Sequence, residues 1–312
     1  MNGVRTAGAR ESIRGGEEPA VDVRFFWVDV FADTALTGNP LPLVPSADAL
    51  TTAQLKAIAR EFNQSETTFL VAPTSPGADH RLRSFTPAGV EVGGAGHNAM
   101  GAWIWLAGSG TLPGDRTEFR QQIGDETLPV GVDRKPGHPP TVTMRQAPPR
   151  FLRAVDRHRE LAEILALDAD QAAPGPAQVV STGVAHLMVP LKGRSAVDDA
   201  IPDSSRLAAL LASVEAEGCY IYSTEHRDDG ADAYARFFNP TVGIAEDPAT
   251  GTAAGPLAAL LVRDGLRAPD GQVTIIQGAA LGRPSRLRVT VDDDRIELSG
   301  TGLVVAEGTL RL

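Results

Sequence analysis

Hydrophobic and polar residues alternate in short runs over most of the chain, and only a few segments carry helical spacing. Runs rich in β-branched and aromatic residues, bounded by Gly, Pro, Asn or Ser, predict strands. The expected strands are residues 21–31, 41–44, 67–71, 81–85, 179–191, 220–223 and 233–238, with β-like pieces over 111–143 and a meander over 273–310.

Helices are expected where apolar residues recur every three or four positions. The first begins at Thr51 or Thr52, either of which can cap it. Its apolar face consists of Leu55, Ile58, Ala59 and Phe62. Further helices are expected at 97–107, 159–167 and 252–262. Many strands with few long helices predict an α+β fold.

A weak internal repeat relates the two halves of the chain. The same identities occur in the same order as Arg83, Phe85, Pro87, Glu91, Gly96 and Ala99, and as Arg236, Phe238, Pro240, Glu246, Gly251 and Ala254. The spacing is constant apart from one slip of two residues. Since solenoid repeats are much shorter, this pattern predicts two similar domains that face each other.

Each copy of the repeat places a glycine-rich turn before an apolar helix. Such a helix start leaves backbone N–H groups unpaired at the positive end of the helix dipole, where carboxylate or phosphate can bind. Gly96-His97 and Gly251-Thr252 lie at these two starts. The alternative is that the glycines only permit close packing. Neither turn has the glycine pattern of an ATP or NAD site.

Composition narrows the class of protein. The 312 residues, 42% of them hydrophobic, suffice for two ordinary domains with buried cores. A formal net charge of −10 argues against nucleic acids and anionic membranes as partners. No apolar run approaches the length of a membrane span. The single cysteine, Cys219, excludes an internal disulfide and is expected to be a small buried hydrophobe.

The expected domains are an N-terminal one over 21–130 and a C-terminal one over 140–299, joined by a linker at 135–140. The sequence leaves open whether a last strand, 300–312, completes the N-terminal domain. Residues 1–20 are expected to be a disordered leader, because they are rich in Gly, Arg, Glu and Ala and contain no aromatic residue. They also lack the apolar stretch of a secretory signal. Together with the lone cysteine, this favours a cytoplasmic protein.

Several stretches together resemble one known family. They are residues 29–31 (Asp-Val-Phe), 38–40 (Gly-Asn-Pro), 63–69 (Asn-Gln-Ser-Glu-Thr-Thr-Phe), 85–87 (Phe-Thr-Pro), 96–97 (Gly-His) and 246–255 (Glu-Asp-Pro-Ala-Thr-Gly-Thr-Ala-Ala-Gly). In this order they resemble the phenazine-biosynthesis isomerases, the PhzF-like proteins, which are relatives of diaminopimelate epimerase. The resemblance covers nearly the whole chain after the leader.

The resemblance implies two pseudo-symmetric domains, each an antiparallel barrel-like sheet around a central helix, with the active site between them. It implies a homodimer that uses no cofactor and no metal. It assigns the catalytic carboxylate to Glu66 and substrate contacts to His97 and Asp247. The backbone at Gly96, Gly251 and Thr252 would hold the substrate's carboxylate.

Two departures from related patterns matter. The distant epimerases carry a cysteine at each glycine turn, and this chain has none there, which excludes their two-thiol mechanism. The family usually has Gly-His-Pro where this chain has Gly96-His97-Asn98. The wall of the pocket near His97 is therefore altered, and the substrate can differ as well.

Each candidate residue also has a purely structural interpretation. Glu66 could be a solvent-facing strand residue, His97 a residue that only starts a helix, and Asp247 a helix cap. The remaining histidines are scattered without metal-ligand spacing, and no role is assigned to His80, His138, His158, His186 or His226.

The leading hypothesis is a cofactor-independent isomerase. Glu66 would move a proton within a small carboxylate-bearing metabolite, such as a cyclic amino or hydroxy acid, in secondary-metabolite biosynthesis. Two alternatives stay open: a one-base epimerase or lyase on the same fold, and a non-catalytic member that binds a small molecule.

Overall fold

The computed structural model describes residues 21–94 and 96–312. The expected leader and Ala95 of the first glycine turn lie outside these residues. The first part of the chain forms β1 (Asp22–Val30), β2 (Asn39–Val44), α1 (Thr52–Phe62), β3 (Thr67–Val71), β4 (His80–Phe85), β5 (Glu91–Val92), α2 (His97–Gly108), β6 (Glu118–Ile123), β7 (Glu126–Asp133) and β8 (Thr141–Gln146).

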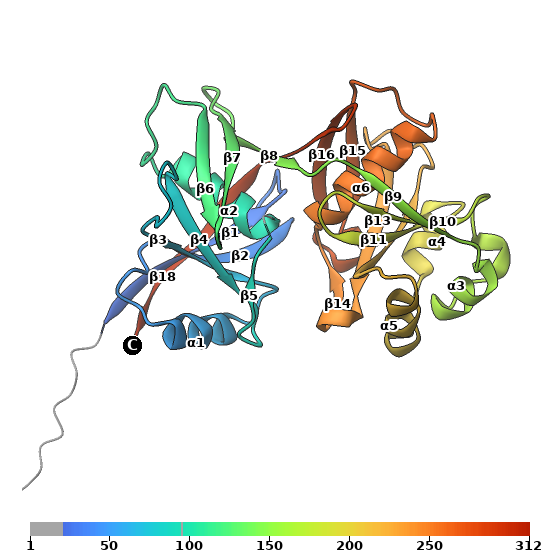
Figure 1. The fold of residues 1–312 in the computed structure, drawn as a ribbon, viewed down its shortest axis with the longest axis horizontal. Coiled ribbons are helices and arrows are strands. Elements are labelled where there is room, and N and C mark those ends of the chain that lie inside the picture. The colour runs from blue at the N-terminus through green and yellow to red at the C-terminus, as the bar shows by residue number, and fades with distance from the viewer. Residues whose placement is uncertain (1–20, 95) are drawn as a thin grey trace, which may run out of the picture.

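The second part forms β9 (Arg150–Val155), α3 (His158–Ile164), β10 (Ala177–Ser181), β11 (Ala185–Pro190), α4 (Arg194–Asp199), α5 (Ser204–Ser213), β12 (Gly218–Ser223), β13 (Ala233–Asn239), β14 (Ile244–Asp247), α6 (Gly251–Arg263), β15 (Gln272–Gln277), β16 (Ser285–Asp292), β17 (Arg295–Gly300) and β18 (Gly302–Arg311). Figure 1 shows two similar bodies side by side, one around α2 and the other around α6.

The same order of strand pairing occurs twice. In the first body β1–β2 is antiparallel, β2–β3 parallel, β3–β4 antiparallel, β4–β6 parallel, and β6–β7 and β7–β8 antiparallel. The pairs β10–β11, β11–β12, β12–β13, β13–β15, β15–β16 and β16–β17 follow the same order of directions. This confirms the predicted α+β fold of two pseudo-symmetric units.

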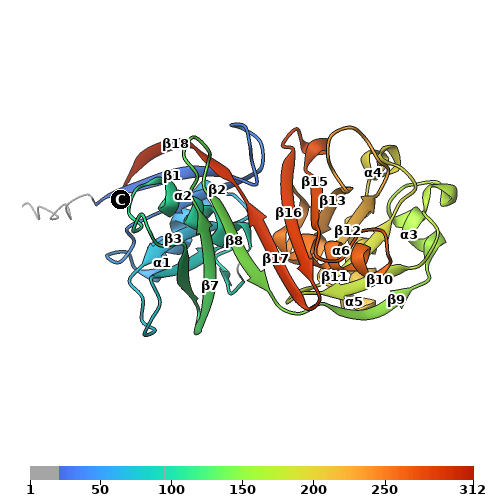
Figure 2. The ribbon, with the colours of Figure 1, turned by 90° about the horizontal axis from the view of Figure 1, so that it is seen from above.

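The two bodies exchange their last strands. β18 pairs antiparallel with β1, and β9 pairs with β10. We therefore define the N-terminal half as β1–β8 plus β18, and the C-terminal half as β9–β17. β8 and β17 pair with each other at the junction, where Figure 2 shows them running side by side.

Two expectations about connections need correction. The expected linker at 135–140 joins β7 to β8, which pair antiparallel, so it is a hairpin loop. The chain crosses to the other half only after β8. The expected strand at 179–191 is a hairpin of β10 and β11, because the chain turns back at Gly183, whose φ is +137°.

The core of each half surrounds its central helix. Trp103 of α2 and Leu257 of α6 are fully buried and belong to one continuous hydrophobic cluster. Cys219 is buried and free, as expected. No helix among the described residues is long and apolar enough to span a membrane.

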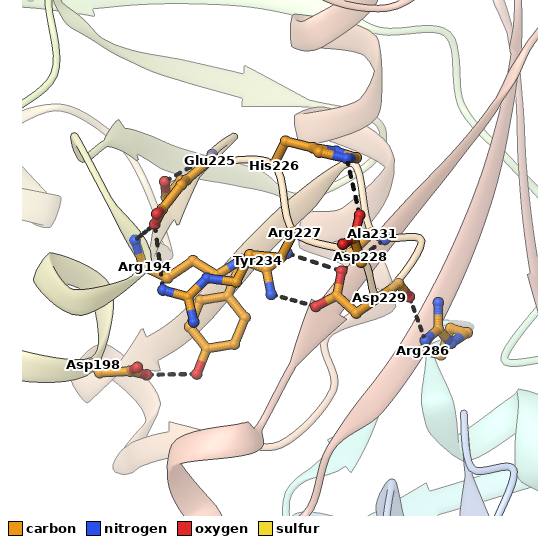
Figure 3. A network of polar contacts seen from close by, with 11 residues as sticks. Arg194, Asp198, Glu225, His226, Arg227, Asp228, Asp229, Ala231, Tyr234 and Arg286 are labelled. Carbon is orange, nitrogen blue, oxygen red and sulfur yellow. Dashed lines mark hydrogen bonds and ion pairs between the residues drawn. The ribbon is translucent and has the colours of Figure 1, made fainter.

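Polar contacts also connect the halves. Arg283, between β15 and β16, donates to Asp29 Oδ1 of β1 at 2.7 Å and to the carbonyls of Thr37 and Gly38. Another polar network lies within the C-terminal half, around the loop between β12 and β13 (Figure 3). There Arg194 pairs with Asp229, whose carbonyl accepts from Arg286 at 3.1 Å.

Candidate active site

Glu66 lies at the junction of α1 and β3. Helix α1 ends because Asn63 adopts the left-handed conformation, with φ 50° and ψ 40°, and its N–H donates to Ala59 O. The chain then turns into β3, and Glu66 precedes the buried Thr67. The Glu66 side chain exposes only 16% of its surface, which excludes the solvent-facing interpretation.

His97 is the first residue of α2 and is buried. Its Nε2 lies 3.3 Å from Glu66 Oε2, but the two atoms are not aligned as a hydrogen bond. Neither atom has a hydrogen-bond partner among the described residues. Buried polar atoms are normally paired, so a gap in pairing here marks a place where a ligand can supply the contacts.

Asp247 ends β14 in the other half of the molecule. Its Oδ1 accepts from Asn39 Nδ2 at 2.9 Å, and its Oδ2 accepts from Thr250 Oγ1 at 2.5 Å. Asn39 Nδ2 also donates to Ala249 O at 2.9 Å. Asn39 begins β2, so this buried amide joins the two halves at the site. The described residues show no backbone N–H of α6 on the Asp247 carboxylate, which argues against a helix cap.

Gln277 at the end of β15 supports the Asp247 turn from behind. Its Nε2 donates to Asp247 O at 2.7 Å and to Thr250 Oγ1 at 3.1 Å. Its Oε1 accepts from Thr250 N at 3.1 Å and from Tyr220 Oη at 2.8 Å. All four hydrogen-bonding positions of the amide are used, so the turn is fixed before any ligand binds.

Burial controls the protonation of the three site residues. It raises the pKa of Glu66 to about 7, because a carboxylate is poorly solvated there. Burial also raises the pKa of Asp247 to about 6; His97 and the bonds from Thr250 and Asn39 oppose this, and Glu66 adds to it. Burial lowers the pKa of His97. The site therefore holds two carboxyl groups poised near neutrality beside a neutral imidazole.

The raised pKa of Glu66 predicts a pH-dependent stability difference between the wild type and Glu66→Gln. Below about pH 4.5 the carboxyl is protonated in the folded and unfolded chains alike, so its burial costs no more than that of the amide. Between about 4.5 and 7 only the unfolded chain ionises, and the wild type loses about 1.4 kcal/mol relative to the variant per unit of that interval. Urea unfolding of both proteins at several pH values measures this; a constant difference would contradict the raised pKa.

The two glycine turns differ in what they offer an anion. The Gly96 N–H donates to Asn98 Oδ1 at 2.8 Å, and Asn98 Nδ2 donates to Gly94 O and Ser84 Oγ. The side chain of Asn98 thus closes the first turn, so the expectation that Gly96 N–H is open to a carboxylate does not hold in this structure. At the second turn, no described group accepts from the Gly251 or Thr252 N–H.

Replacing Asn98 by Ala is expected to destabilise the protein by about 1–3 kcal/mol, because it removes the three hydrogen bonds that the buried amide makes to Gly96, Gly94 and Ser84. The free energy of unfolding from urea titration measures this. A change below about 0.5 kcal/mol would show that water satisfies the turn equally well.

Other residues of this site were not predicted as functional. Asn39 stands in the Gly-Asn-Pro stretch, but only the fold reveals its contact with Asp247, 208 positions away. His186, to which no role was assigned, has its Nε2 3.1 Å from Thr252 Oγ1. No group of three or more His, Cys, Asp or Glu side chains in the described parts of the chain could hold a metal ion.

Comparison with known proteins identifies the family. The family profile described as "Phenazine biosynthesis-like protein" matches residues 28–308. The chain belongs to this family. It is 33% identical to a trans-2,3-dihydro-3-hydroxyanthranilate isomerase of Pseudomonas aeruginosa over 290 residues, covering 91% of this chain and 98% of the relative. Relatives of this name confirm the expected enzyme class, an isomerase.

Solved structures confirm the expected fold of the phenazine biosynthesis-like family. A PhzF-family protein of Bacillus anthracis superimposes with a TM-score of 0.85 at 25% identity, over 94% of this chain and all of that one. A predicted epimerase of Pseudomonas aeruginosa gives a TM-score of 0.80 at 31% identity, over 92% and 99% of the two chains.

Proposed function

We propose that the protein is a cofactor-independent isomerase that moves a proton within a small carboxylate-bearing metabolite. The observation that carries this proposal is the Glu66 carboxyl, which is buried against His97 and has a pKa raised to about 7. No described Arg or Lys pairs with it. A carboxyl group that titrates near neutrality can take up and return a proton at physiological pH.

In the proposed reaction, the Glu66 carboxylate takes a proton from a carbon made acidic by conjugation. The electron pair of the broken C–H bond moves into the π-system of the substrate. Glu66, now protonated, returns the same proton to another carbon of that system. The net change is a shift of one hydrogen and of the double bonds, so no oxidant, reductant or second substrate is needed.

The other groups would bind and orient the substrate. The free N–H groups of Gly251 and Thr252 at the start of α6 suit its carboxylate, where negative charge also develops during the reaction. Neutral His97 and the carboxyl of Asp247 suit hydroxyl or amino groups on the ring or chain. The Asn98 side chain occupies the Gly96 N–H, so the substrate carboxylate is placed at the start of α6.

The relatives suggest the substrate class. Trans-2,3-dihydro-3-hydroxyanthranilate, named in the relatives, carries a carboxylate, an amino group and a hydroxyl on a partly unsaturated ring. This chain is proposed to act on that compound or on a similar amino or hydroxy acid of secondary metabolism. A predicted epimerase among the similar structures keeps a one-base epimerase as the second candidate.

Incubation in D₂O separates these candidates. With trans-2,3-dihydro-3-hydroxyanthranilate or a related acid, an isomerase is expected to yield a product with shifted double bonds, detected by NMR. An epimerase would instead give an inverted centre carrying deuterium, and a lyase would release water. Turnover of none of a panel of cyclic and acyclic amino and hydroxy acids would favour the binding-only alternative.

A further inference from the structure

His186 lies on β11, buried in the C-terminal half, and takes no part in the proposed proton transfer. Its Nε2 is 3.1 Å from Thr252 Oγ1, and its ring packs edge-on against Phe237 at 5.1 Å between ring centroids. Its Nδ1 is buried without a hydrogen-bond partner among the described residues. The imidazole thus contacts one polar group, Thr252, and is otherwise enclosed.

The surroundings of Nδ1 decide where the ring carries its hydrogen. A Cβ built at Gly218 would lie 3.2 Å from Nδ1, so that nitrogen faces the backbone Cα of Gly218. A neutral imidazole has one N–H and one bare nitrogen. An N–H on Nδ1 would be a buried donor facing a C–H group, whereas a bare Nδ1 tolerates that neighbour. The hydrogen therefore belongs on Nε2, facing Thr252.

The ring stays neutral, so this preference holds at physiological pH. Burial lowers the pKa of His186 to about 3. The Nε2–H then donates to Thr252 Oγ1, and the Thr252 hydroxyl cannot donate back to the ring. The Thr252 hydroxyl has no other hydrogen bond among the described residues, and Thr252 is only partly buried while its neighbours in α6 are buried.

The internal repeat places Thr252 at the site. Thr252 occupies in α6 the position that His97 occupies in α2, at the same offset as the matched glycines 96 and 251. Its hydroxyl hydrogen is not used by the ring, so it is available to a ligand at the start of α6, where the substrate carboxylate is proposed to bind. With the opposite tautomer, only oxygen lone pairs would face that carboxylate and repel it.

We propose that His186 is a positioning residue, which donates from Nε2 to Thr252 and thereby turns the Thr252 hydroxyl into a donor for the substrate's carboxylate. The placement of the carboxylate rests on the proposed function, whereas the tautomer and the direction of the hydrogen bond do not. The site would therefore prefer an anionic carboxylate over the uncharged carboxamide of the same shape.

The tautomer can be measured in the ligand-free protein. Two-dimensional ¹⁵N–¹H NMR at neutral pH distinguishes pyrrole-type from pyridine-type ring nitrogens, and the His186→Leu spectrum identifies the signals of His186. We expect a pyridine-type Nδ1 and a pyrrole-type Nε2. The reverse assignment, or a charged ring, would overturn the inference and leave the proposed function intact.

Binding tests the second step, with 2-aminobenzoate and 2-aminobenzamide as probes in calorimetric titrations. Thr252→Val is expected to weaken 2-aminobenzoate binding roughly tenfold, the effect of one hydrogen bond to a charged group. His186→Leu is expected to weaken it less, about threefold, and to have no further effect in the Thr252→Val background. Binding of 2-aminobenzamide should change little in either variant.

His186→Gln serves as the conservative variant, because its Nε2 can reach the position of the imidazole Nε2–H and restore affinity. Thermal unfolding shows whether each variant is folded. Equal affinity of wild type and Thr252→Val for 2-aminobenzoate, or independent effects of the two substitutions, would overturn the inference. Lack of turnover in D₂O would overturn the proposed function alone, since neither NMR nor probe binding depends on catalysis.

Discussion

Glu66→Gln is expected to lower kcat by roughly 10²–10⁴-fold, the range that general acid–base assistance typically supplies. The amide keeps the shape of the carboxyl but cannot accept a proton, so the first bond cleavage fails. Substrate affinity should be nearly unchanged, because the proposed contacts of the substrate's carboxylate lie at α6, in the other half of the molecule. Steady-state kinetics, with the substrate that the D₂O experiment identifies, would measure kcat and the substrate affinity.

Two further variants make this prediction specific. Glu61→Gln removes an exposed carboxyl of the preceding helix and should leave kcat unchanged. Glu66→Asp keeps a carboxyl but withdraws it by one methylene, so its activity should fall between those of wild type and Glu66→Gln. If Glu66→Gln retained wild-type kcat, another group would have to be the base, and Asp247 is the next candidate.

The order of elements was predictable because the repeated residues make repeated contacts. Arg83 pairs with both carboxylate oxygens of Glu91 at 2.7 and 2.8 Å, and Arg236 pairs with those of Glu246 at 2.9 and 2.8 Å. Each guanidinium also lies over the phenylalanine ring two residues further along its strand. The matched identities thus mark the same paired strands before each central helix.

The local sequence pattern of two short helices is also typical of helices. Helices α4 and α5 were not predicted, although Asp203 is a good cap and Leu207, Leu210 and Leu211 have helical spacing. The pairing of β18 with β1 has no local signal, because it joins segments at opposite ends of the chain.

The candidate active site likewise contains some residues that the sequence predicts and others that it does not. Glu66, His97 and Asp247 lie in recognisable stretches, and the structure brings Glu66 and His97 within 3.3 Å of each other. The groups that orient them were not predictable, because their partners are remote in sequence. Asn39 reaches Asp247 across 208 positions, and His186 reaches Thr252 across 66. Asn98 departs from the usual Gly-His-Pro pattern of the family, yet its hydrogen bond from the Gly96 N–H follows only from three-dimensional geometry.

Arg283→Met is expected to destabilise the protein by about 3–5 kcal/mol. Asp29 is only 1% exposed, and Arg283 is its one ionic partner among the described residues. Removing the guanidinium leaves a buried carboxylate whose one remaining side-chain contact within residues 21–94 and 96–312 is the Leu36 N–H. Two carbonyls of the loop before β2 lose their donor as well. The free energy of unfolding from urea titration would measure the loss.

The exposed pair Arg24–Glu307 provides the matched control. Both side chains are more than half exposed, so Arg24→Met should cost at most about 1 kcal/mol even though its 2.8 Å contact resembles that of Arg283. Pairing Arg283→Met with Asp29→Asn should recover part of the loss, because no unpaired charge then remains buried. Equal costs for the two arginine substitutions would mean that water reaches Asp29, and that this contact contributes little to holding β1 against the C-terminal half.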